Sequence, residues 1–286
     1  TPSYSVNLKL ERAMRLTKNS NIRLHISDLS ETDRLLSLME ECSVSGLVHL
    51  AARPGVREPL SRIRQYMDSN VSAFGSTLSA AVASNVQYFI YASSSSVYGS
   101  LDRFAYEESE EALEPVSIYG ATKLANEKIA SAVASASGIP TVGLRLFTVY
   151  GPWGRPDMMP WQTVAAALSG RKLRLNGDGR AVRDFTYIDD IVNGTIKSLN
   201  HKGFDIINLG RGNPYSINEL IKAIESLTDK KAIIKYEKPY NSEMKLTSAS
   251  IKKAQKELNW EPKIDFKTGI EKTIEWSMKN KKLMMK

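Results

Sequence analysis

The sequence has little cysteine and histidine: its 286 residues include one cysteine, Cys42, and three histidines. A single cysteine excludes a disulfide within the chain, and a reducing, cytoplasmic setting is the simplest inference. The histidines, His25, His49 and His201, are scattered and lack the spacing of a metal-ligand cluster. We therefore expect no metal site.

Long hydrophobic runs are also lacking. Runs such as residues 164–168 are far too short to span a bilayer, and the first residues do not resemble a signal peptide. The net charge of +8 could favour a nucleic-acid partner, but the basic residues are spread out, and part of the excess lies in residues 279–286. No nucleic-acid-binding motif accompanies this charge. We expect a soluble protein that binds neither membranes nor nucleic acid.

What the sequence does contain is an alternation of strand-like and helix-like stretches. The predicted strands are residues 22–26, 46–50, 88–92 and 141–146, and the predicted helices are residues 7–16, 35–41, 69–84 and 119–137. This alternation indicates βαβ units and therefore an α/β fold with a doubly wound, Rossmann-like parallel sheet. Ligands of such sheets bind at the carboxyl ends of the strands.

A loop rich in glycine and proline follows Thr148 and marks the start of a smaller C-terminal α/β domain. We predict that the sheet domain comprises residues 1–148 and 184–205, and the smaller domain residues 149–183 and 206–286. Within the smaller domain we expect a strand over residues 206–209. A helix over residues 216–227 follows, with Ser216 and Glu219 in capping-box spacing.

Candidate catalytic side chains cluster around two of these elements. Tyr119 and Lys123 are four residues apart at the start of a helix, so they lie on one face. A lysine ammonium near a phenol favours the phenolate, which makes tyrosine a usable base. By itself this pair is also typical of a solvated helix face. Four serines after the preceding strand add Ser94, which could share a substrate proton with Tyr119, although loop polarity alone could explain them.

Six motifs, taken in order, resemble those of the extended short-chain dehydrogenase/reductases. They are residues 49–52, Asn70, and residues 93–99, 119–123, 144–152 and 183–190. The resemblance implies NAD as cofactor in the sheet domain and a nucleotide sugar in the smaller domain. It implies that Ser94 is the hydroxyl partner, Tyr119 the general base, and Lys123 the residue that binds the cofactor's ribose and modulates the base.

The resemblance also assigns the rest of the cofactor site. Asp28, followed by Leu29, matches the acidic residue that binds the adenine of NAD. Ala51 and Ala52 would pass under the pyrophosphate, and Asn70 would support the site. The family begins with a strand and a Gly-x-x-Gly-x-x-Gly turn, which no residue before Tyr4 matches.

Without that strand we expect apolar edges and unpaired backbone groups in the sheet. Activity is therefore conditional on a glycine-rich segment, and the alternative of another class is a non-catalytic nucleotide-sugar-binding protein.

The identities of Ser95 and Ser96 narrow the choice among the reactions of the family. Relatives that dehydrate the sugar carry an Asp-Glu pair here, and those that decarboxylate UDP-glucuronate usually carry a glutamate in the Ser96 place. Epimerisation at C4 of a UDP-sugar remains, through a 4-keto intermediate. The chain resembles UDP-glucuronate 4-epimerases most, through residues 147–158. Ser95, Ser96, Thr148 and Arg155 could bind the C6 carboxylate, although Arg155 could also be a surface arginine. The alternative is a UDP-glucose/UDP-galactose 4-epimerase.

The resemblance places further substrate contacts and a partner. Arg183 lies where the family binds the UDP diphosphate, and Arg211 is either a second contact or a solvent-facing residue. Asp184 is expected to be structural. Glu243 could replace the acid that binds the uridine ribose. We also expect a homodimer through residues 69–84 and 119–137, with burial inside the monomer as the competing explanation for their small residues, which are Ala73, Gly75, Ala80, Ala81, Ala125, Ala130 and Ala132.

Overall fold

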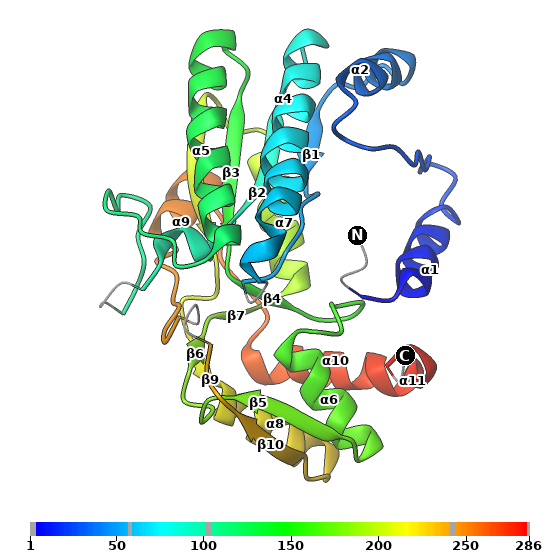
Figure 1. The fold of residues 1–286 in the computed structure, drawn as a ribbon, viewed down its shortest axis with the longest axis vertical. Helices are drawn as coiled ribbons and strands as arrows, with labels where there is room; N and C mark the ends of the chain where they lie inside the picture. The colour runs from blue at the N-terminus through cyan, green and yellow to red at the C-terminus, as the bar shows by residue number, and fades with distance from the viewer. Residues whose placement is uncertain (1–3, 57–58, 101–103, 241–243, 285–286) are drawn as a thin grey trace.

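A computed structural model of the chain describes residues 4–56, 59–100, 104–240 and 244–284. Its main sheet has four parallel strands in the order β1-β2-β3-β8 (Figure 1). These strands are β1 (Leu47–His49), β2 (Phe89–Ser94), β3 (Thr141–Leu146) and β8 (Phe204–Leu209). The register pairs Ser94 with Leu146 and Leu146 with Leu209, so the carboxyl ends of β2, β3 and β8 are level. The predicted parallel α/β sheet is confirmed.

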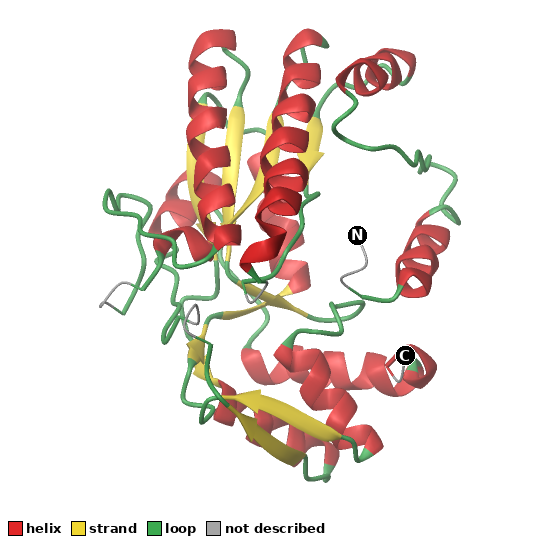
Figure 2. Cartoon of the chain, in the orientation of Figure 1, coloured by secondary structure: helices red, strands yellow, loops and turns green. Residues whose placement is uncertain are grey.

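Helices cover both faces of this sheet because the side chains of each strand alternate. Phe89 and Tyr91 pack under α2 (Thr32–Glu41), α4 (Ala73–Ala83) and α5 (Ile118–Ser137). Ile90 points to the other face, toward α7 (Ile188–Ser198) and α9 (Lys252–Leu258). The two apolar clusters make the sheet a buried layer between helices (Figure 2).

A second, smaller region packs beneath the sheet around its own apolar core. Its helices are α6 (Met159–Ser169), α8 (Ile217–Thr228), α10 (Phe266–Lys279) and α11 (Lys281–Met284), and its strands β5 (Lys172–Asn176) and β10 (Ile233–Glu237) pair in parallel. The predicted capping box begins α8: the Ser216 hydroxyl accepts from the Glu219 amide at 3.1 Å, and Glu219 accepts from the Ser216 amide at 2.7 Å.

Short elements join the two regions. Two parallel strands, β4 (Thr148–Tyr150) and β7 (Phe185–Tyr187), pair with each other, and β6 (Val182–Arg183) pairs antiparallel with β9 (Tyr215–Ser216). The other described elements are α1 (Val6–Leu16), η1 (Leu60–Arg62), α3 (Ile63–Tyr66), η2 (Met67–Ser72) and η3 (Ser95–Tyr98). Among the described residues, no helix has both the length and the apolar character needed to cross a membrane.

The domain boundary at residue 206 needs correction. β8 begins at Phe204 and pairs with β3 along its full length, so residues 206–209 belong to the main sheet rather than to the smaller region. Ile207 and Leu209 are fully buried against sheet neighbours, and α9 packs on the same face. The chain thus returns to the sheet twice, for the strand β8 and, after α8 and β10 of the smaller region, for the short helix α9. The rest of the division stays a prediction.

The strand predicted at residues 22–26 is wrong. These residues form an irregular stretch between α1 and α2, and Ile26 is 79% exposed. A strand needs the backbone groups of a neighbour, and no described strand lies next to this segment. On β1, which is the edge of the sheet, Val48 is 40% exposed, and Leu50 just beyond it is 63% exposed. The expected apolar edge is therefore present.

Candidate active site

The serine loop follows β2 directly and is buried. Ser94 caps η3: its hydroxyl oxygen accepts a hydrogen bond from the Ser96 amide at 3.1 Å, and its hydroxyl donates to the Ser96 hydroxyl at 3.1 Å. Ser95 is buried and Ser96 is half-buried. The capping therefore holds the Ser94 and Ser96 hydroxyls together at the carboxyl end of the strand, where a ligand of the sheet would bind.

Tyr119 lies in the first turn of α5, and this turn packs tightly against the serine loop. Ser117 caps the helix by accepting from the Gly120 amide at 3.0 Å. A Cβ on Gly120 would lie 2.5 Å from the Ser96 carbonyl oxygen, so only glycine allows this approach. The Ser94 hydroxyl lies close enough to Tyr119 to lower the pKa of its phenol. The structure thus brings Ser94 and Tyr119 together.

The pKa of Tyr119 is nevertheless raised above its ordinary value. Burial is the largest cause, and it outweighs the effects of the nearby Ser94 hydroxyl and of the positive charge of Arg155, which both lower the pKa. Our expectation that a lysine would make the phenol more acidic is therefore not met in this structure. Desolvation of the phenolate has the larger effect.

Lys123 lies one turn further along α5 and is 1% exposed. Its ammonium donates to the Ala92 carbonyl oxygen at 2.7 Å and lies 5.8 Å from the centre of the Tyr119 ring. Burial lowers the pKa of Lys123 to about 8. An ammonium has three donors, and Ala92 accepts from one of them, so others remain for a bound cofactor.

Asn70 fastens the loop after β1 to α5. It is buried in η2, where its side-chain oxygen accepts from the Arg53 amide at 2.6 Å and its amide group donates to the Arg53 carbonyl and the Thr122 hydroxyl, both at 3.0 Å. Thr122 in turn donates to the Tyr119 carbonyl at 2.8 Å. Ala51, which is exposed, and Ala52, which is half-buried, precede this fastened residue. The loop that is expected to pass under the pyrophosphate is thus held against the helix that carries Tyr119.

Asp28 lies in the irregular stretch instead of at a strand end. Its carboxylate is fully exposed and accepts hydrogen bonds from the Ser30 amide at 2.9 Å and the Ser30 hydroxyl at 2.8 Å, which lower its pKa. Leu29 is half-buried against α2 and α4. The expected role of Asp28 and Leu29 at the adenine stays a prediction, and the structure does not bring Asp28 to the serine loop.

Arg155 lies in the loop before α6 and is paired with an acid. Its guanidinium forms a two-point ion pair with Asp157, with Nε donating to Oδ1 at 3.0 Å. Its charge still reaches Tyr119, where it lowers the pKa of the phenol. α1 braces the same loop, because Arg12 donates to the Trp153 and Gly154 carbonyl oxygens at 2.5 and 2.8 Å. Thr148 is half-buried at the start of β4.

The expected diphosphate residues flank a structural carboxylate. Asp184 is fully buried and accepts from the amides of Arg211, Gly212 and Ala249. Burial raises its pKa, and a structural role agrees with these contacts. Arg183 on β6 donates to the Val182 carbonyl at 2.8 Å and is half-buried.

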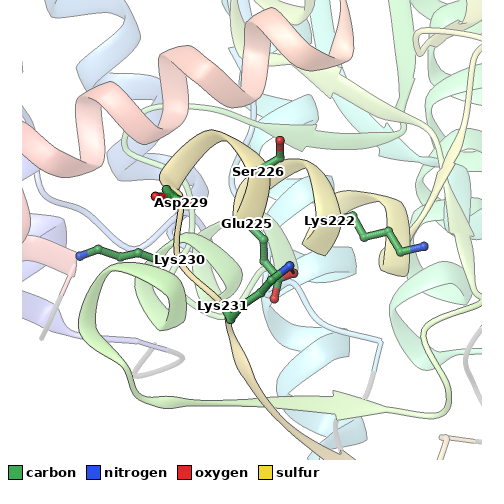
Figure 3. A pocket seen from close by; sticks show the side chains of 6 residues that line it. All are labelled: Lys222, Glu225, Ser226, Asp229, Lys230 and Lys231. Carbon is green, nitrogen blue, oxygen red and sulfur yellow. Dashed lines mark hydrogen bonds and ion pairs between the residues drawn. The ribbon is translucent and has the colours of Figure 1, made fainter.

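Arg211 and Glu243 are the remaining two candidate site residues. Arg211 donates from its guanidinium to the Ile264 carbonyl oxygen, so it fastens the chain before α10. Glu243 lies outside the described residues. The hollow of about 360 Å³ on α8 is lined by Lys222, Lys230, Lys231, Asp229, Ser226 and Glu225 (Figure 3). These are mostly solvated lysines and acids on a helix of the smaller region, and none is a candidate site residue.

Sequence reasoning missed a buried polar cluster behind the serine loop. Ser93 donates to Glu127 at 2.5 Å, and Arg145 donates to both carboxylate oxygens of Glu127 at 2.9 and 2.8 Å. Two signals could have revealed it. Glu127 follows Lys123 by one further turn on the same helix face, and Arg145 is a charged residue inside an apolar strand.

Comparison with known proteins places this geometry in a family. The model of the NAD dependent epimerase/dehydratase family matches residues 3–210. The chain belongs to this family. It is 38% identical to a UDP-glucuronate 4-epimerase of Thermodesulfobacterium geofontis, over 99% of this chain and 87% of the relative, and 36% identical to UDP-glucuronate 4-epimerase 5 of Arabidopsis thaliana, over 94% of this chain and 66% of the relative.

A solved structure agrees with these relatives. The UDP-glucuronic acid 4-epimerase of Bacillus cereus, in complex with UDP-glucuronic acid and NAD, is similar with a TM-score of 0.89 and 33% identity, covering 96% of this chain and 87% of that chain. NAD is thus the cofactor of the family. The residues present fit NAD at the end where hydride is exchanged, since Lys123 is buried beside Tyr119 with donors to spare.

Proposed function

We propose that the chain catalyses the NAD-dependent epimerisation of a UDP-sugar at C4, with UDP-glucuronate and UDP-galacturonate as its substrate pair. The observation that carries this proposal is the placement of the Ser94 hydroxyl beside the Tyr119 phenol at the carboxyl end of β2, with Lys123 buried alongside. The relatives named above support the substrate class, because they are UDP-glucuronate 4-epimerases.

The residues perform the proton part of the reaction. Tyr119 as phenolate takes the proton of the C4 hydroxyl, while Ser94 holds that hydroxyl by a hydrogen bond. A bound NAD would supply the acceptor and the donor of the hydride that leaves C4 and returns to the other face of the ring. The 4-keto sugar turns between these steps, and Tyr119 then gives its proton back to the C4 oxygen. Because burial raises the pKa of the Tyr119 phenol, the phenolate is its minor form near neutral pH, and the Ser94 hydroxyl and the charge of Arg155 offset part of that effect. Lys123, buried beside the Tyr119 ring, would bind the ribose of the cofactor.

Substrate recognition divides between the two regions. Ser95, Ser96, Thr148 and Arg155 would bind the C6 carboxylate, Arg183 the diphosphate and Glu243 the uridine ribose. Because Arg155 is paired with Asp157, a substrate carboxylate would have to compete with that acid. A fixed carboxylate would also protect the 4-keto uronate, a β-keto acid, from loss of carbon dioxide.

Incubation with each sugar nucleotide tests the proposal. The protein with added NAD is given UDP-glucuronate or UDP-glucose, and the epimers are separated by chromatography. Turnover of UDP-glucuronate is expected. Turnover of UDP-glucose alone would contradict the role of Arg155 and Thr148. Turnover of neither sugar, with no bound NAD in the ultraviolet spectrum or by mass analysis, would favour the non-catalytic binding protein.

We further propose a cytoplasmic homodimer that uses the outer sides of α4 and α5. Four of the seven small residues, Ala73, Ala80, Ala81 and Ala130, are buried within the chain itself, so monomer packing accounts for them. Gly75, Ala125 and Ala132 are half-buried or exposed and could allow close approach of a second copy. Light scattering of the protein and of Ala132→Arg tests this, since the variant should be a monomer. Cell fractionation tests the location.

A further inference from the structure

Three successive turns of α5 are fastened to three successive residues of β2. Tyr119, Lys123 and Glu127 are spaced by four residues and so share one face of the helix. Tyr119 lies beside the Ser94 hydroxyl, which lowers the pKa of its phenol, the Lys123 ammonium donates to the Ala92 carbonyl at 2.7 Å, and Glu127 accepts from the Ser93 hydroxyl at 2.5 Å. The catalytic pair is therefore the outer end of a continuous set of contacts between helix and strand.

The inner end of this set is an ion pair inside the protein. Glu127 and Arg145 each have side chains only 4% exposed, and Arg145 binds both carboxylate oxygens. Arg145 also lies 4.6 Å from the centre of the Tyr98 ring, and the Tyr98 hydroxyl donates to Asn208 at 2.8 Å. Glu127 is thus held by Arg145 on β3, and Asn208 on β8 supports this arrangement through Tyr98. Glu127 in turn binds Ser93 on β2.

Stability alone is a poor reason for such a pair. Burying two charges costs several kcal/mol of desolvation, and apolar residues of similar volume often replace buried ion pairs without loss of stability. A charged, two-point hydrogen bond does fix geometry closely, and a shift of about 1 Å at a catalytic group can cost about a hundredfold in rate. More precise positioning of the serine loop would explain why this ion pair is buried there.

We propose that Glu127 and Arg145 are a positioning pair, which holds Ser93 and thereby keeps Ser94 in register with Tyr119. The proposal rests on the proposed epimerase function only for its kinetic consequence. The contacts themselves lead to a second prediction, which does not depend on the reaction: when the Ser93 contact is lost, α5 should loosen from β2, and water should reach Lys123.

Ser93→Ala tests the proposal, with Ser277→Ala as the matched control. Both serines are buried, and Ser277 donates to the Thr273 carbonyl at 2.7 Å within α10. Ser93→Ala should lower kcat by about tenfold or more while KM changes less than about twofold, and Ser277→Ala should change neither. Ser93→Thr, which keeps the hydroxyl, should restore part of kcat. Equal kcat in Ser93→Ala and Ser277→Ala would overturn the proposal.

The pKa of Lys123 gives a second measurement that needs no turnover. Competitive acetylation across a pH series, followed by mass analysis of the Lys123 peptide, should give a pKa of about 8 in the unchanged protein. His49 and Tyr119, which face Lys123, are both neutral near that pH because the pKa of His49 is lowered and that of Tyr119 is raised. Ser93→Ala should raise the pKa of Lys123 by about one unit or more, and Ser277→Ala should leave it unchanged.

The two measurements separate the two proposals. If the unchanged protein turns over neither sugar, the epimerase proposal fails, and the Lys123 measurement alone decides the positioning role. A pKa of Lys123 that is the same in Ser93→Ala and Ser277→Ala would overturn that role. Glu127→Gln should act in the same direction as Ser93→Ala, and the milder serine variant remains informative if Glu127→Gln does not fold.

Discussion

Residues 22–26 and residues 88–92 are both predicted strands, but they have very different structures. Both are short stretches with alternating or continuous apolar residues. The second lies in β2, between β1 and β3, where Ile90 is 1% exposed. The first is irregular and its Ile26 is largely exposed. The apolar pattern provides a side chain that can be buried, but the neighbouring strands decide whether a strand forms.

The same contrast divides the candidate site. Ser94, Tyr119 and Lys123 lie where β2, β3 and α5 support one another through buried hydrogen bonds. Asp28, the residue expected at the adenine, lies in the exposed stretch between α1 and α2. The three residues proposed to act on the sugar are thus held by contacts within the described chain, while Asp28, expected at the adenine, is not.

Replacement of the base should have the largest effect. Tyr119→Phe keeps the aromatic ring in its place on α5 and removes the proton acceptor. General base catalysis contributes about a hundredfold to ten-thousandfold, and we expect kcat to fall by that amount while UDP binding is retained. Tyr236→Phe, on exposed β10, is the control. Normal turnover in Tyr119→Phe would show that another group is the base.

The sheet around β2 should lose much of its stability when a buried side chain is removed. Ile90→Ala removes a buried side chain from the middle strand β2, between α7, α9 and the neighbouring strands. A loss of about 2–5 kcal/mol in the free energy of unfolding is expected, measured by urea denaturation. A loss well below this range would mean that the sheet core adapts to the cavity, which would weaken the contrast with residues 22–26.

The pH dependence of stability should come in part from His49 on β1. Its ring packs edge-on to Phe74 with centres 5.3 Å apart, and burial, aided by the charge of Lys123, lowers its pKa from 6.5 to about 4. Between these pH values the unfolded chain binds a proton that the folded chain does not, so stability falls as the pH drops from 6.5 toward 4.

The shift corresponds to a loss of about 3 kcal/mol. Urea denaturation of the unchanged protein and of His49→Phe over this pH range measures it, and the difference between the two curves should shrink by that amount. Parallel curves would mean that His49 is protonated in the folded state as readily as in the unfolded state.

Much of the fold follows from local patterns. The strands after residue 46 and the helix over residues 119–137 were predicted because their apolar patterns match elements that have partners in the chain. Ser94 and Tyr119 were predicted to meet because the carboxyl end of a strand and the start of the following helix lie at the same edge of a parallel sheet. The boundary at residue 206 failed because nothing local in residues 206–209 tells which sheet they join.

Other features depend on long-range contacts and could not be predicted from local pattern. The raised pKa of Tyr119 follows from burial by the whole site, whereas the sequence shows only the nearby lysine. The pairing of Arg155 with Asp157 lies within one loop, but a spacing of two residues does not by itself predict an ion pair. Ser93 meets Glu127 only because α5 lies in one register on β2.

The smallest effect on stability should come from a substitution in residues 22–26. Ile26→Ala makes the same change of side chain as Ile90→Ala, at a position that is 79% exposed. Surface substitutions usually change stability by less than about 0.5 kcal/mol, and the two variants, unfolded in urea under the same conditions, should therefore differ by about 2 kcal/mol or more. If Ile26→Ala costs as much as Ile90→Ala, residues 22–26 are packed against other residues in solution. The contrast between the two stretches would then be lost, and the adenine end of the site would have the support that the described contacts do not give it.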